Sequence, residues 1–227
     1  MAANTVGWTF VLKALALQVV TGGVLFGCAG TLRWPFAWAW LSCVLLLQLA
    51  TVWILAWHSP DLLAERSRLQ PGTRSWDKVV APVMIFGPLL TMLAASLERR
   101  FRGERWPVWT EAAALLVTLA GGVVTAAAMY VNRFFSTTVR IQSERGHVVV
   151  SGGPYRVVRH PGYVGMLLVY AAMPFALGSR WGLTPAALVV ILVMVRTALE
   201  DRTLRAELPG YAEYAATVRY RLLPGVW

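Results

Sequence analysis

The chain reads GGPYRVVRHPGYVG at residues 152–165, a polar and turn-rich stretch that leads directly into an apolar run. A second charged cluster, Arg196 with Glu200 and Asp201, follows the next apolar run. Ionisable side chains at the edge of a membrane domain are costly to hold there, and they usually serve a site. We therefore expect these two clusters to decide what the C-terminal half of the chain binds.

Outside these clusters the sequence predicts an integral membrane protein. Of its 227 residues, 57% are hydrophobic and only 14% are charged, which is too apolar for an ordinary soluble domain. A helix needs roughly 20 apolar residues to cross a bilayer. Four runs have about this length: Ala14–Leu32, Phe36–Trp57, Val79–Leu97 and Ala112–Val131. Two shorter runs, Gly162–Gly178 and Trp181–Val195, predict either two short spans or one re-entrant hairpin.

Two further patterns predict helices outside the membrane. The residues Ser59-Pro60-Asp61 form a helix start with proline at the first helical position, and Gln70-Pro71-Gly72 is a turn signal. In the tail from Glu200, apolar residues recur at helical spacing, and Pro209-Gly210 must interrupt or restart that helix. The predicted fold class is all-α, with about five to six transmembrane helices and a cytosolic C-terminal helix.

The net charge of +10 raises the question of nucleic-acid binding. The basic residues, however, gather between the apolar runs, where the positive-inside rule places them. With a cytoplasmic N-terminus, and with the two short runs together returning the chain to the same side, 15 of the 21 Lys and Arg residues fall on the cytoplasmic side. The exceptions are Arg33, Arg180 and the cluster Arg99, Arg100, Arg102 and Arg105. We expect membrane lipids as partners and no nucleic acid. Cys28 and Cys43 lack metal-ligand spacing, and we expect no metal site.

Two interpretations are open for the loop at 152–165. Its prolines restrict the backbone and its glycines allow a ligand to approach closely, so His160 and its neighbours are candidates for a polar binding site. Alternatively, the arginines face lipid phosphates and the tyrosines belong to the aromatic belt of the membrane. No GxSxG, HExxH or Walker sequence is present, and the glycines do not follow the strand-GxGxxG-helix order of a Rossmann domain.

The second cluster is equally open. Arg196 and Glu200 are four residues apart and lie on one face of a helix, so they can form an intrahelical salt bridge. Two adjacent carboxylates at a membrane helix end can instead accept hydrogen bonds from ribose hydroxyls or balance a cationic ligand. Arg196 can orient an anionic acceptor or hold Glu200 in place.

Taken in order, these elements resemble the isoprenylcysteine carboxyl methyltransferase family and, more broadly, the membrane methyltransferases that include phospholipid N-methyltransferases. The resemblance covers residues 132–227. It rests on GPYR at 153–156, RHPGYVG at 159–165, ALGS at 176–179, Arg196 with Glu200-Asp201, and Gly210-Tyr211 with Tyr214. The family usually has two glutamates where this chain has Glu200-Asp201, so the second acid is one methylene shorter here.

The resemblance implies an all-helical membrane enzyme that uses S-adenosylmethionine in a cytosol-facing pocket. It implies catalytic roles for Arg196 and Glu200. It implies cofactor contacts at Tyr155, Arg159, His160, Pro161, Tyr163, Gly165, Glu200, Asp201 and Tyr214. It also divides the chain into a four-span membrane region at 1–131 and a cofactor-binding catalytic region at 132–227, which together form one integrated domain.

Three functions remain in view. The first is a methyltransferase in a bacterial inner membrane that acts on a lipid, a lipophilic small molecule or a lipidated acceptor, through a carboxylate of the isoprenylcysteine type or an amine. The second is an NADPH-dependent membrane reductase, because YRLLP at 220–224 resembles the ending of membrane sterol reductases. The third is a non-catalytic transporter or scaffold. The gathering of charge at one end favours a cytosol-facing site over a transport pathway.

Overall fold

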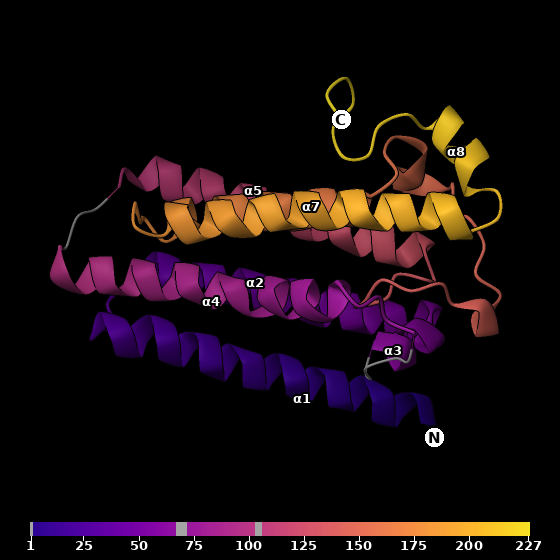
Figure 1. Cartoon of the computed structure of the whole chain (residues 1–227). Coiled ribbons are helices and arrows are strands. Elements are labelled where there is room, and N and C mark those ends of the chain that lie inside the picture. The colour runs from indigo at the N-terminus through magenta and orange to yellow at the C-terminus, as the bar shows by residue number, and fades with distance from the viewer. Residues whose placement is uncertain (1, 67–71, 103–105) are drawn as a thin grey trace.

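Figure 1 shows the computed structural model as an elongated bundle of long helices, in which the N-terminus and helix α8 lie at the same end. The structure describes residues 2–66, 72–102 and 106–227. Its elements are α1 (Ala2–Gly22), η1 (Gly23–Gly27), α2 (Pro35–His58), α3 (Pro60–Arg66), α4 (Asp77–Phe101), α5 (Val108–Val131), η2 (Ser143–Arg145), η3 (Gly153–Arg156), α6 (Pro161–Ala176), α7 (Leu183–Glu207) and α8 (Tyr211–Thr217). Within these ranges there is no strand, which confirms the all-α prediction.

Five helices of the described chain are long and apolar enough to cross a membrane. Two of them differ from the predicted runs. The first begins at Trp8 instead of Ala14, since a lysine side chain is long enough to carry the charge of Lys13 away from the apolar surface. The last is α7, which continues past Arg196 to Glu207. Among the helices that contain the predicted apolar runs, α6 alone is short, so the predicted hairpin joins one short helix to one full-length span.

Helix α3 confirms the start predicted at Ser59-Pro60-Asp61. The turn predicted at Gln70-Pro71-Gly72 has its first two residues outside the described chain. The predicted break at Pro209-Gly210 is confirmed, because α7 ends at Glu207 and Gly210 adopts a φ of +80° before α8 begins. A residue with a Cβ is strained in that backbone conformation, which explains glycine at this corner.

The hairpin of α6 and α7 is fixed at its turn and along α6. At one end Glu98 of α4 accepts hydrogen bonds from Ser179 Oγ (2.6 Å) and from the backbone N–H of Trp181 (2.8 Å). Along its length α6 packs tightly on α5, where a methyl group built on Gly121 would lie 2.7 Å from the carbonyl oxygen of Gly165. These contacts set the position of the helix ends that carry the polar clusters.

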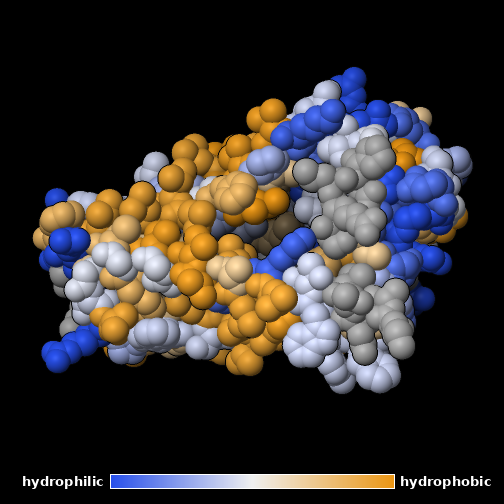
Figure 2. Space-filling model, turned by 90° about the horizontal axis from the view of Figure 1, so that it is seen from below, coloured by the Kyte–Doolittle hydropathy of each residue, from blue (hydrophilic) through white to orange (hydrophobic). Residues whose placement is uncertain are grey.

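The outer surface of the bundle suits lipid. Leu116 of α5 is 67% exposed and Leu188 of α7 is 64% exposed, although both lie in the middle of long apolar helices. Seen from below, apolar side chains cover most of the helical body, and hydrophilic ones gather toward one end (Figure 2). A hollow opens between the two regions on this face.

Candidate functional site

A cavity of about 1170 Å³, which includes open space at its mouth, lies at the end of the bundle that carries α8. Six parts of the described chain contribute to its wall: the end of α3, α4, the irregular segment 132–150, the loop before α6 that contains η3, the α6–α7 hairpin, and α8. The lining residues used below are Arg66, Met84, Ile85, Phe134, His147, Tyr155, Arg159, His160, Tyr163, Met166, Arg196, Glu200, Leu204, Tyr211 and Tyr214.

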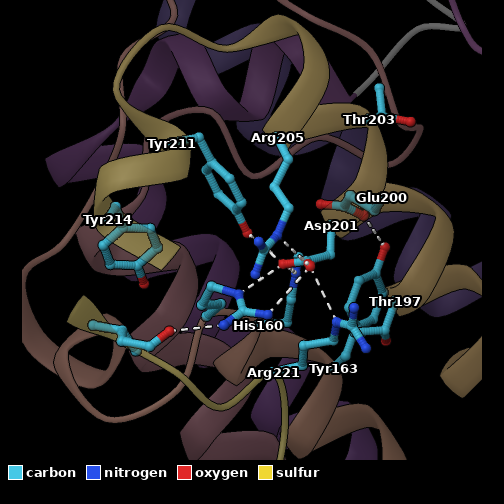
Figure 3. Close-up of polar contacts among 12 residues, drawn as sticks. His160, Tyr163, Thr197, Glu200, Asp201, Thr203, Arg205, Tyr211, Tyr214 and Arg221 are labelled. Carbon is cyan, nitrogen blue, oxygen red and sulfur yellow. Dashed lines mark hydrogen bonds and ion pairs between the residues drawn. The ribbon is translucent and has the colours of Figure 1, made fainter. Parts of the chain in front are cut away.

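Glu200 is the one carboxylate among the described residues that line this cavity. The hydroxyl of Tyr163 donates a hydrogen bond to Glu200 Oε2 and fixes the direction of the carboxylate (Figure 3). No donor in the described part of the chain makes a hydrogen bond to the other oxygen, Oε1. An anchored carboxylate with one uncommitted oxygen is suited to accept a hydrogen bond from a ligand.

Asp201, next to Glu200, has a different environment. Its side chain is fully buried and lies at the centre of the cluster drawn in Figure 3. Five side chains surround its two oxygens: Arg159 Nε (2.7 Å), Tyr211 Oη (3.0 Å), Arg221 Nε (3.0 Å), Arg205 Nε (3.1 Å) and His160 Nε2 (3.3 Å). Asp201 does not line the cavity. The geometry therefore favours a role for Asp201 in holding the site together.

Arg159 connects the loop at 152–165, called the RHP loop below, to the C-terminal tail that follows α7. Its Nη1 donates to the carbonyl oxygens of Val218 (2.7 Å) and Arg219 (2.6 Å), in addition to the ion pair with Asp201. The backbone N–H groups of Arg159 and His160 donate to the carbonyls of Tyr220 (2.9 Å) and Arg221 (3.0 Å). The loop at 152–165 and the tail thus form one unit around Asp201.

The tyrosines of the site use their hydroxyls within the protein. Tyr214 donates to the carbonyl of Tyr155 (2.7 Å), whose own hydroxyl accepts from Asn132 Nδ2 (3.0 Å). Burial raises the pKa of Tyr155, and it raises the pKa of Tyr214 to about 12. Both phenols are therefore neutral at pH 7. Their rings line the cavity and are the part available to a ligand.

Arg196 does not pair with Glu200. Its Nε and Nη2 bind the two carboxylate oxygens of Asp77 at 2.7 and 2.9 Å, and Nη2 also donates to the carbonyl of Thr137 (2.9 Å). Asp77 is fully buried at the start of α4 and also accepts from the backbone N–H of Val139 (2.6 Å). The sequence reasoning missed Asp77. The signal for it was available, since a carboxylate at the start of an apolar run is as costly as Arg196.

The remaining predicted contacts, at Pro161 and Gly165, do not line the cavity. Pro161 is the first residue of α6, where its missing N–H has no cost. Gly165 faces Thr125 and the carbonyl of Gly121 on α5. Both residues set the position of α6, and a direct contact with a cofactor stays a prediction for them, as it does for Asp201.

The segment 132–150 belongs to the predicted cofactor-binding region at 132–227, but no residue within it was predicted as a contact. His147 lies against Phe134, with 4.6 Å between the ring centroids, and its Nδ1 accepts from the backbone N–H of Gln142 (3.3 Å). Its pKa is lowered to about 4, first by burial and then by the charges of Arg140 and Arg145. His147 therefore presents a neutral imidazole to the cavity at pH 7.

This pKa predicts a pH dependence of stability. Between about pH 6.5 and 4 the unfolded chain binds a proton at His147 that the folded chain does not, so stability is lost as the pH falls through this window. We expect His147→Gln to lose less thermal stability than the unmodified protein when the pH is lowered from about 7.5 to 5. Thermal unfolding in detergent at both pH values measures this. An equal loss in the two proteins would contradict the burial of a neutral His147.

Residues 109–208 match the model of the phospholipid methyltransferase family. The match begins in α5, includes the RHP loop and α6, and ends just after α7, so it contains Tyr155, His160, Tyr163, Arg196 and Glu200. A search of the curated proteins found no match to the chain.

Proposed function

Because residues 109–208 match the model of the phospholipid methyltransferase family, we propose that this protein transfers a methyl group from S-adenosylmethionine to a lipophilic acceptor. One observation carries the proposal: the matched segment supplies the anchored carboxylate of Glu200, together with the rings of Tyr155 and Tyr163, to a single cavity. A carboxylate of the isoprenylcysteine type, or an amine on a lipid, is the acceptor that this proposal includes.

The lining residues fit the chemistry of this cofactor. S-adenosylmethionine carries a positive sulfonium, two ribose hydroxyls and a flat adenine ring. Glu200 Oε1 can accept from a hydroxyl or balance the positive charge, and the faces of Tyr155, Tyr211 and Tyr214 suit the ring and the cation. When bound, the cofactor supplies an electrophilic methyl group.

The contribution of the protein is then position and exclusion of water. A displacement at a methyl carbon needs its two reactants in line, and fixing that geometry can supply about 7–11 kcal/mol. Tyr163 fixes Glu200, and the Asp201 cluster fixes the loop and tail that carry His160 and Tyr214. None of these groups needs to move a proton for the methyl group to transfer.

The cavity also has an apolar side. Met84 and Ile85 of α4 and Met166 of α6 line it, and Ile85 is 52% exposed on the outer surface of the bundle. An apolar chain can therefore pass from the lipid into the cavity between helices. The hollow on the apolar face in Figure 2 supports this lateral entry.

We expect the purified protein in detergent to bind S-adenosylhomocysteine saturably in calorimetric titrations and to show no binding of NADPH. The cavity offers a carboxylate and aromatic rings for the first ligand. Binding of NADPH alone would contradict the proposal and favour the reductase. A folded protein that binds neither ligand would favour a non-catalytic role.

A further inference from the structure

Arg66 is a cation of the cavity wall that the methyl transfer does not use. It ends α3, the short helix between α2 and α4, and its side chain lines the cavity. Its Nη1 donates to the carbonyl of Phe135 (3.1 Å), and its guanidinium lies 5.5 Å from the ring centroid of Phe135. Both contacts hold the side chain toward the cavity without neutralising its charge.

The three fully buried arginines of this end each have a carboxylate partner. Arg140 pairs with Glu65 (2.8 Å), Arg159 with Asp201 (2.7 Å) and Arg196 with Asp77 (2.7 Å). Arg66 makes no ion pair with any residue in the described ranges, and the sequence SRLQP at 67–71 contains no acid. The half-buried guanidinium of Arg66 thus keeps a positive charge in the cavity wall with no carboxylate of the described chain beside it, an arrangement that favours an anionic ligand.

The charges around Arg66 also favour an anionic ligand. Its pKa is lowered to about 10, first because burial desolvates the guanidinium and second because the charge of Arg196 is close. Two arginines thus face one part of the cavity, still charged at neutral pH. The nearby Asp77 is already bound to Arg196 at two points and to the backbone of Val139.

We propose that Arg66 and Arg196 together bind an anionic group, a phosphate or a carboxylate, carried by a lipid whose apolar chain lies between α4 and α6. Arg66 supplies the planar, paired N–H donors that bind such oxyanions, and Arg196, whose Nε and Nη2 are bound to Asp77, adds its Nη1. The apolar neighbours Met84, Ile85 and Met166 favour an anion attached to a chain over a free anion. This inference rests on the proposed function in making that lipid the methyl acceptor.

Calorimetric titration with decyl phosphate, decanoate, decanol and inorganic phosphate tests the proposal on the full chain in a nonionic detergent. We expect the two charged amphiphiles to bind more tightly than decanol or inorganic phosphate. Arg66→Gln should weaken decyl phosphate and decanoate about tenfold or more. Arg66→Lys should retain part of that affinity, because it keeps the charge but not the paired donors.

The matched control is Arg202→Gln, since Arg202 is exposed on α7 and does not line the cavity. It should bind every probe as the unmodified protein does. Unchanged binding in Arg66→Gln, equal binding of decanol, or equal binding of inorganic phosphate would each overturn the proposal.

A parallel titration with S-adenosylhomocysteine separates the two hypotheses. We expect Arg66→Gln to bind it normally; a tenfold loss would mean that the arginines hold the carboxylate of the cofactor, which overturns the lipid assignment. If the unmodified protein binds no S-adenosylhomocysteine but still binds decyl phosphate through Arg66, the proposed function fails and the anion site stands.

Discussion

Replacement of Glu200 by Gln is expected to lower the affinity for S-adenosylhomocysteine about 10- to 100-fold and to leave the fold intact. A hydrogen bond to a charged group contributes roughly 1.5–3 kcal/mol, and about 1.4 kcal/mol corresponds to a tenfold change in affinity. Glu200 is the only acid of the described chain that lines the cavity. Glutamine keeps the shape of the side chain and an oxygen that can accept from Tyr163, so the packing around it is preserved.

Calorimetry measures the affinity, and thermal unfolding in the same detergent measures the fold. Glu213→Gln is the matched control, because Glu213 is exposed on α8 and does not line the cavity. Tyr163→Phe leaves the charge of Glu200 but frees its direction, and we expect it to lose less affinity than Glu200→Gln. Normal affinity in Glu200→Gln would mean that the carboxylate serves only to hold Tyr163.

The fold was predictable because a bilayer leaves few options. Backbone groups inside lipid must pair within a helix, so each long apolar run in this chain reads as one span. The predicted helix bounds were wrong where a charged residue lies within an apolar helix. The apolar run predicted before Arg196 ends at Val195, yet α7 continues through Arg196 because the carboxylate of Asp77 compensates the charge of the buried guanidinium.

The sequence predicted many of the residues that line the site, but not the residues that they contact. Spacing shows that Arg196 and Glu200 share a helix face, but it cannot show that Asp77, from a distant helix, binds Arg196 first. Adjacent residues of a helix also point in different directions, about 100° apart around the helix axis. Glu200 therefore reaches the cavity while Asp201 reaches the tail. Arg66 and His147 lie outside the long apolar helices, in segments where no periodic pattern marks a residue as facing the cavity.

The divergence of this acid pair leads to the second large effect. We expect Asp201→Asn to destabilise the protein by about 3–5 kcal/mol, because removing one partner leaves a buried charge uncompensated. The charge concerned is that of Arg159, which is buried beside Asp201. Arg205 and Arg221 lose their anion at the same time. The tail that carries Tyr214 should separate from the RHP loop, and ligand binding should fail as a consequence.

Thermal or denaturant unfolding in detergent measures this loss directly, with Glu213→Gln again as the control. Asp201→Glu keeps the charge and adds one methylene, so we expect it to be more stable than Asp201→Asn, at the cost of fitting a longer side chain into a closed cluster. The two variants should differ in unfolding: Asp201→Asn should unfold more easily and lose its ligand as a consequence, whereas Glu200→Gln should stay folded and lose only its ligand. If Asp201→Asn instead keeps full stability and loses only the affinity for S-adenosylhomocysteine, then Asp201 acts on the ligand, and the contacts around it do not hold the fold.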